Sequence, residues 1–181
     1  MLDKTKIEKE GYYILDKIKS SMQLAPWDMF IELANTLPYM RHTFVSGAGR
    51  SGLVARSFGM RLMHAGLPAF IPGETVTPAA GKGDLLVAIT CTGKTGYTRY
   101  LAGRAKELGA KVIIITASEE SSLKDVSDKI IYIPVNEKDI VLRAAIFEHT
   151  TSLCLDALFN VISKKLKLNL NIFRERHANL E

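Results

Sequence analysis

The chain has 181 residues, of which 47% are hydrophobic and 24% charged, and its formal net charge is +5. This length suits one globular domain spanning 1–181, and a mean hydropathy of +0.07 excludes a disordered chain. No apolar run approaches the ~20 residues that a membrane-spanning helix needs, which excludes an integral membrane protein.

The first ten residues alternate in charge and lack the apolar stretch of a secretory signal, so we predict a cytoplasmic protein. Cys91 and Cys154 lie far apart and outside any Cys/His cluster, so we predict reduced thiols and no metal site. The small excess of basic residues is scattered along the chain. It suits a phosphorylated small molecule as well as it suits nucleic acid.

Two amphipathic helices are predicted in the N-terminal part, 1–38, at Ile7–Met22 and Trp27–Leu37. Short apolar runs rich in β-branched residues then alternate with helical segments. The predicted strands are Thr43–Ser46, Ala69–Ile71, Leu85–Thr90, Val112–Thr116 and Ile130–Val135. The predicted helices between and after them are Ser51–Ala65, Thr95–Leu108, Ser121–Val126 and Leu142–Leu166.

The strands read as continuous hydrophobic runs, which is typical of parallel strands buried on both faces. We therefore predict an α/β fold with a doubly wound five-stranded parallel sheet in 43–135, flanked by helices. The part 142–181 is predicted as a long helix and a polar tail, with Ile172 and Phe173 as its anchor pair. In such a sheet ligands bind at the carboxyl ends of the strands, so the loops after the first and third strands matter most.

The first of these loops, 46–52, reads Ser-Gly-Ala-Gly-Arg-Ser-Gly and opens a helix, an arrangement that favours anion binding. A dinucleotide fingerprint begins similarly, but no acidic residue ends the second predicted strand to bind a ribose. A tight structural turn is the other interpretation. The candidate substrate-binding residues here are Ser46, Gly47, Gly49, Arg50 and Ser51.

The second loop, Thr90-Cys-Thr-Gly-Lys-Thr95, resembles a relaxed P-loop. A nucleoside triphosphatase also needs an acidic residue at the end of a second strand to organise magnesium, and the predicted strands supply none. The remaining cluster of hydroxyls at a helix start can bind one phosphate. Thr95 as a simple helix cap is the plainer interpretation. The candidate residues are Thr90, Thr92, Lys94 and Thr95.

Five motifs follow one another along essentially the whole chain: Ser46-Gly-Ala-Gly-Arg-Ser-Gly-Leu-Val-Ala55, Arg61-Leu-Met-His-Ala-Gly66, Gly73-Glu-Thr-Val-Thr-Pro78, Gly81-Lys-Gly-Asp-Leu-Leu86 and Arg176-His-Ala-Asn-Leu-Glu181. Their order resembles the 6-phospho-3-hexuloisomerases of the sugar isomerase (SIS) domain superfamily. The resemblance implies a three-layer sandwich and a homotetramer. It also implies conversion of 3-hexulose 6-phosphate to fructose 6-phosphate, in formaldehyde fixation or, in reverse, in pentose supply.

Moving a carbonyl from C3 to C2 requires a base that removes the C2 proton, a cis-enediolate, and return of a proton at C3. The resemblance points to Glu148 as this base, close to the start of the last helix, where the helix dipole favours a carboxylate. An ordinary glutamate of the first turn is the alternative. His177 is the second catalytic candidate, for ring opening or oxygen protons, and would reach the site across a subunit interface.

The chain departs from the family pattern at two places. The family's phosphate loop typically reads Ser-Gly-Ser-Gly-Glu-Thr, so Lys94 replaces an acid here while three hydroxyls remain. The family's Pro-x-Gly-Thr before Phe-Glu is replaced by Leu142-Arg-Ala-Ala145. These departures keep open a non-catalytic SIS domain that senses a phosphosugar, with a nucleotide-binding protein as a third possibility. Our prediction is an isomerase without cofactor or metal. Its partners would be a sugar phosphate and copies of itself, with no nucleic acid or membrane.

Overall fold

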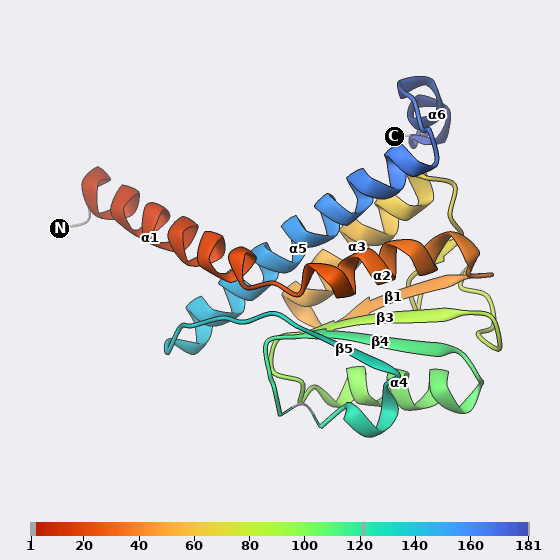
Figure 1. Ribbon diagram of the computed structural model, residues 1–181, viewed down its shortest axis with the longest axis horizontal. Helices are drawn as coiled ribbons and strands as arrows, with labels where there is room; N and C mark the ends of the chain where they lie inside the picture. The colour runs from red at the N-terminus through yellow and green to blue at the C-terminus, as the bar shows by residue number, and fades with distance from the viewer. Residues whose placement is uncertain (1–2, 121, 181) are drawn as a thin grey trace.

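The computed structural model describes residues 3–120 and 122–180. Its helices pack on both faces of a central sheet (Figure 1). In chain order the elements are α1 (Lys4–Gln23), α2 (Trp27–Thr36), η1 (Leu37–Tyr39), β1 (Thr43–Gly47), α3 (Gly49–His64), β2 (Ala69–Phe70), β3 (Leu85–Thr90), α4 (Gly96–Glu107), β4 (Lys111–Thr116), η2 (Lys124–Val126), β5 (Lys129–Tyr132), α5 (Ile140–Lys165) and α6 (Leu170–Arg176).

The sheet has five strands in the order β2-β1-β3-β4-β5, and every pairing is parallel. Thr43 of β1 lies opposite Leu85 of β3, and Gly47 lies opposite Ile89. The predicted doubly wound parallel sheet is therefore confirmed. The strand order reverses between β1 and β3, so the loops that leave these two strands diverge. This is the place where ligands bind in open α/β sheets.

Two hydrophobic cores cover the two faces of the sheet. Along β3, which is buried at every position, side chains alternate between them. Val87 and Ile89 face the core shared with α1, α2, α3 and α5, whereas Leu86 and Ala88 face the core under α4. Figure 1 shows α4, with η2 beside it, on one side of the sheet and α1, α2, α3 and α5 on the other. None of the described helices is both long and apolar enough to cross a membrane.

The structure differs from the predicted elements toward the C-terminus. The last strand ends at Tyr132 rather than Val135, with Pro134, which lacks an N–H donor, two residues further on. The polar tail is not irregular throughout, because it forms α6, whose first turn is capped by the side chain of Asn169. The predicted helix 121–126 begins at Ser121, which lies outside the described residues; its described part holds only the 3-10 turn η2. Glu181 of the terminal motif also lies outside them.

Candidate functional site

The loop after β1 is a tight turn that only glycine allows at two positions. A Cβ on Gly47 would lie 2.7 Å from the backbone of Ser51, and Gly49 has a positive φ of 56°. Ser46 and Ser51 are buried at this turn, whereas Arg50 projects from the first turn of α3 into a largely exposed position. The turn thus brings a guanidinium to the carboxyl edge of the sheet.

Arg50 forms an ion pair with Glu148, in which Arg50 Nε donates a hydrogen bond to Oε2 of the carboxylate. The Glu148 side chain is only 8% exposed. The expectation that Glu148 lies near a helix start is wrong, because α5 begins at Ile140 and Glu148 falls in its third turn. A helix dipole acts within about one turn, so it is Arg50 that supports the buried carboxylate.

The loop after β3 presents hydroxyl groups at the start of α4. The hydroxyls of Thr90 and Thr95 lie 3.3 Å apart, and Thr92 Oγ1 accepts a hydrogen bond from the backbone N–H of Lys94 at 3.3 Å. Thr95 occupies the N-cap position of α4, but its side chain makes no capping hydrogen bond. The simple cap interpretation of Thr95 is therefore not supported. The predicted phosphate-binding residues do lie together in this loop.

A cavity of about 460 Å³ opens beside this loop, within the ~300–1,000 Å³ usual for small-molecule sites. It lies where β3 and β4 end and α5 begins. Arg143 is fixed at its wall, because its guanidinium donates a hydrogen bond to the Ala117 carbonyl at 2.7 Å. The lining residues are Cys91, Thr92, Lys94, Ser118, Lys138, Ile140, Arg143 and Ala144.

Cys91 connects this cavity to the Arg50–Glu148 pair. Burial raises the pKa of its thiol, the charge of Arg143 opposes that shift, and the charge of Glu148 adds to it. The thiol is therefore neutral and a poor nucleophile at neutral pH. Ala144, which lines the cavity, lies four residues before Glu148 on the same face of α5, so the buried carboxylate lies close to the cavity.

His177 lies elsewhere in the chain. Its ring stacks on that of His64, with centroids 5.3 Å apart. Burial first, then the charges of His177 and Arg61, lower the pKa of His64. His64 ends α3 while Arg50 lies in its first turn, so the 16-residue helix separates them by most of its ~24 Å length. The structure does not bring His177 and Glu148 together within one chain.

Sequence reasoning did not select Ser118, Lys138 or Arg143, all of which line the cavity. Ser118 follows β4 as Thr92 follows β3, so the rule about carboxyl ends of parallel strands could have found it. Lys138 and Arg143 flank the start of α5, and no local motif marked them as binding residues.

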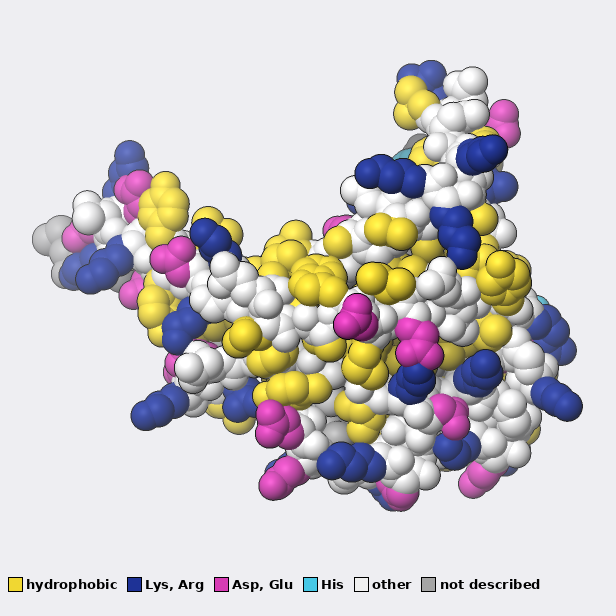
Figure 2. All heavy atoms as spheres, in the orientation of Figure 1, with side chains coloured by type: hydrophobic (Ala, Val, Ile, Leu, Met, Phe, Trp, Pro, Cys, Tyr) yellow, Lys and Arg dark blue, Asp and Glu magenta, His cyan; other side chains and the backbone are white. Residues whose placement is uncertain are grey.

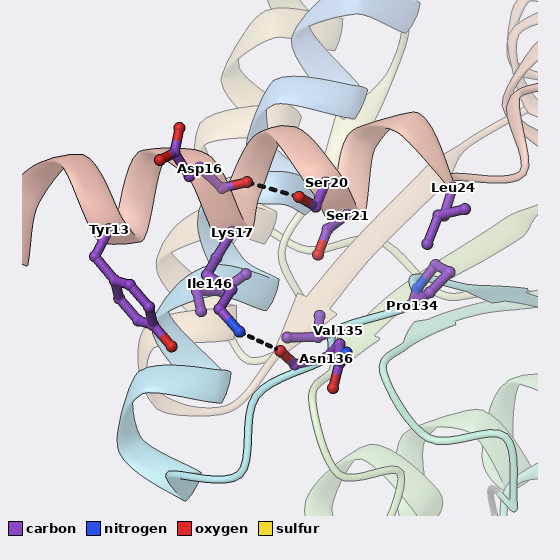
Figure 3. A pocket seen from close by; sticks show the side chains of 10 residues that line it. All are labelled: Tyr13, Asp16, Lys17, Ser20, Ser21, Leu24, Pro134, Val135, Asn136 and Ile146. Atoms are coloured by element: carbon purple, nitrogen blue, oxygen red, sulfur yellow. Dashed lines mark hydrogen bonds between the residues drawn. The ribbon is translucent and has the colours of Figure 1, made fainter.

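A second hollow, of about 390 Å³, lies between α1 and the segment that joins β5 to α5 (Figure 3). There Lys17 Nζ donates a hydrogen bond to the Asn136 carbonyl at 2.9 Å. The hydroxyl of Tyr13 donates to Glu137 at 2.8 Å. None of the predicted site residues lines this hollow. The two hydrogen bonds attach α1 to the segment that joins β5 to α5.

The chain matches the family model of the SIS domain over residues 39–161. A 3-hexulose-6-phosphate isomerase of Bacillus subtilis is 35% identical over 176 residues, which cover 93% of this chain and 95% of that protein. One of Mycobacterium gastri is 34% identical over 156 residues, covering 82% and 78%. A solved structure from Methanococcus jannaschii, from which the function of 3-hexulose-6-phosphate isomerase was inferred, has a TM-score of 0.85 and 29% identity, covering 92% of this chain and 98% of that one.

Proposed function

The chain belongs to the SIS domain family, and from this membership we propose that it interconverts 3-hexulose 6-phosphate and fructose 6-phosphate. The observation that carries the proposal is the pairing of the buried Glu148 carboxylate with Arg50 beside a hydroxyl-rich loop. The relatives named for this reaction match most of the chain. The reaction would serve formaldehyde fixation, or pentose supply in reverse.

In the proposed mechanism the phosphate of the sugar binds at Thr92, with the N–H groups at the start of α4 and the ammonium group of Lys94 as donors. Glu148 removes the C2 proton of 3-hexulose 6-phosphate and returns a proton to C3 of the cis-enediolate. Arg50 holds the carboxylate in place and offers positive charge near the developing enediolate oxygens. The same groups serve the reverse reaction, in which the C3 proton of fructose 6-phosphate is removed.

His177 takes part in this proposal only if it comes from a second subunit. Within one chain it lies near the far end of α3 from Arg50. Its imidazole would assist ring opening or carry protons between the sugar oxygens. The role therefore depends on assembly into a homo-oligomer, for which the resemblance suggests a tetramer.

Two exposed apolar surfaces support association with further copies. α1 projects from the body (Figure 1), and its large residues Ile7 and Leu15 are 67% and 56% exposed. Figure 2 shows hydrophobic side chains gathered over α2 and α5. There Trp27, Ile31 and Val161 line a shallow apolar groove. A projecting helix gains most of its stability from packing an apolar face, so these surfaces fit contact between subunits.

The proposal is tested by adding wild-type protein to fructose 6-phosphate and following new 3-ketose signals by NMR. Melting temperatures are measured in parallel with fructose 6-phosphate and with magnesium ATP, because a ligand stabilises the state that binds it. We expect turnover and stabilisation by the sugar phosphate alone. Stabilisation without turnover would favour the phosphosugar sensor. Stabilisation by ATP alone would favour the nucleotide-binding protein.

A further inference from the structure

The cavity beside the Thr92 loop holds more positive charge than one phosphate requires. Lys94, Lys138 and Arg143 all line it. Neither lysine ammonium group forms an ion pair or a hydrogen bond with any residue in the described part of the chain. The guanidinium of Arg143 bonds only a neutral acceptor, the carbonyl of Ala117. Three cations around one hollow repel one another, and this repulsion is relieved by a bound anion.

The carboxylates next to the cavity are already engaged. Asp139 caps α5, because its side chain accepts hydrogen bonds from the N–H groups of Val141 and Leu142. Glu137 accepts the hydroxyl of Tyr13 and backbone N–H groups, which lower its pKa to about 2. Glu148 is paired with Arg50. Glu119, which follows Ser118, interacts with Tyr132. Among the residues that the structure describes, no carboxylate forms an ion pair with Lys138 or Arg143.

The three cationic side chains of the cavity come from different parts of the fold. Lys94 shares the loop after β3 with Thr92, so it belongs to the hydroxyl cluster at the start of α4. Lys138 and Arg143 flank the start of α5, with Ser118 after β4 also lining the cavity. A phosphate carries about −1.5 to −2 charges near neutral pH, which Lys94 and the helix start offset. Lys138 and Arg143 then remain without an anion.

We propose that this cavity takes a sugar phosphate with a second anionic group, which Lys138 and Arg143 hold while the first phosphate lies at the Thr92 loop. The inference rests on the proposed function for the position of that first phosphate, but not on catalysis at Glu148. The planar guanidinium suits two-point binding of a carboxylate or a phosphate, and a lysine adds a mobile charge. The shared chemistry is a second anion on the sugar.

The test measures affinities of the full-length protein by titration calorimetry at fixed ionic strength. The probes are three sugar phosphates. Fructose 6-phosphate has no second anion, fructose 1,6-bisphosphate has a second phosphate, and 6-phosphogluconate has a carboxylate. We expect the wild type to bind at least one of the two doubly anionic sugars ~10-fold more tightly than fructose 6-phosphate. The tighter of these two identifies the source of the second anion.

Two variants and a control test whether Lys138 and Arg143 bind the second anion. Lys138→Gln and Arg143→Gln should each lower affinity for the doubly anionic sugar ~10-fold and change that for fructose 6-phosphate less than ~2-fold. Arg143→Gln loses the hydrogen bond to the Ala117 carbonyl and could disturb the loop. Lys138 is exposed, so Lys138→Gln should fold normally and tests the inference independently. Lys82→Gln removes the same charge at the opposite edge of the sheet and should change neither affinity.

Three results would overturn the inference. Equal affinity of the wild type for all three sugars would mean that no second anion is bound. Equal losses for singly and doubly anionic sugars in Lys138→Gln would mean that Lys138 holds the first phosphate, which leaves the proposed function intact. Binding of none of the sugars would overturn the proposed function together with the inference. Selective binding without isomerase activity would uphold the inference and refute the proposed function.

Discussion

Arg50 reaches from the first turn of α3 to Glu148 in the third turn of α5, and its Nε donates a hydrogen bond to the buried carboxylate. The two residues are far apart in the sequence but meet where the strand order reverses between β1 and β3. The carboxylate is almost entirely removed from water, while the guanidinium is mostly exposed. The pair therefore fixes the orientation of the buried carboxylate.

Removing Arg50 should destabilise the protein, because it leaves a buried charge without its partner. We expect Arg50→Gln to lower the free energy of unfolding by ~1 kcal/mol. This is the low end of the ~1–3 kcal/mol cost of leaving a buried polar group unpaired, because Arg50 is exposed and water screens its charge. In a Glu148→Gln background the same change should cost less than ~0.5 kcal/mol. Urea unfolding of the four proteins measures both values. Equal costs in the two backgrounds would show that the pair contributes nothing to stability.

The hydroxyl of Thr92 is predicted to bind the phosphate. Thr92→Ala should weaken binding of fructose 6-phosphate by ~1–3 kcal/mol, because a phosphate oxygen loses its donor. Thr36→Ala, whose lost hydroxyl bonds the Glu32 carbonyl at the end of α2, is the matched control and should leave affinity unchanged. Calorimetry of both variants decides the matter. If Thr92→Ala binds as tightly as the wild type, the phosphate lies elsewhere.

Gly66 ends α3 and supports the docking of α6. Its φ is +77°, and a Cβ there would lie 2.6 Å from the guanidinium of Arg176, which donates a hydrogen bond to the His64 carbonyl. Gly66→Ala should therefore lower the free energy of unfolding by ~1–2 kcal/mol and speed tryptic cleavage after Arg174. Gly11→Ala, in the open middle of α1, should instead stabilise by ~0.5–1 kcal/mol. Unchanged stability and cleavage in Gly66→Ala would contradict this role for Gly66.

Asp84 makes the protein sensitive to acid. Burial acts to raise its pKa, but hydrogen bonds from Arg41 and the Gly81 N–H, with the charges of Arg41 and His42, outweigh burial and hold the pKa below its ordinary value. A depressed folded-state pKa gives stability that is present above the unfolded pKa, ~3.9, and is lost as the pH falls toward the folded value.

The variant Asp84→Asn should therefore be less stable than the wild type at pH 7. The difference between the two proteins should shrink as the pH falls below about 4. Thermal unfolding from pH 7 to pH 2.5 follows this difference, with Asp16→Asn, an exposed residue of α1, as the control. A difference that stays constant across this range would show that Asp84 has an ordinary pKa in the folded protein.

The sheet could be predicted from the sequence because its strands are local apolar runs with clear ends. Leu85–Thr90 has the predicted bounds, since it is apolar up to Thr90 and Gly81 to Asp84 form a turn before it. The helix α6 could not be predicted in the same way. It depends on Phe173, whose ring lies 6.0 Å from that of Phe159 and 6.5 Å from that of His64. Asn169 is a local capping signal for α6, but the partners of Phe173 lie in distant segments and no local pattern identifies them.

In the candidate site, too, local features could be predicted from the sequence and contacts between distant segments could not. The two loops were predicted because glycines and hydroxyls after buried strands are a local signal. That Lys94 shares a cavity with Arg143 depends on how β3, β4 and α5 meet, which no spacing in the sequence records. Glu148 was placed near a helix start although it is already the seventh residue of the predicted helix 142–166, and the cap at Asp139 moves the true start still further from it, to Ile140. A cap search upstream of Leu142 would have found this cap.

Hydrogen exchange between the sugar and the solvent tests whether Glu148 is the base of an isomerase. Wild-type protein is incubated with fructose 6-phosphate in deuterated buffer, and NMR follows the C3 proton together with formation of the 3-ketose. Glu148→Gln keeps the shape of the side chain but cannot accept a proton. Glu32→Gln, which removes an exposed carboxylate paired with Lys129, is the control.

We predict that the wild type and Glu32→Gln exchange the C3 proton and form the 3-ketose. Glu148→Gln should lose both activities by ~10²–10⁴-fold, while its affinity for fructose 6-phosphate stays within ~2-fold. Exchange in Glu148→Gln as fast as in the wild type would assign the base to another residue. Wild-type protein that binds the sugar phosphate yet shows neither exchange nor turnover would contradict the isomerase itself.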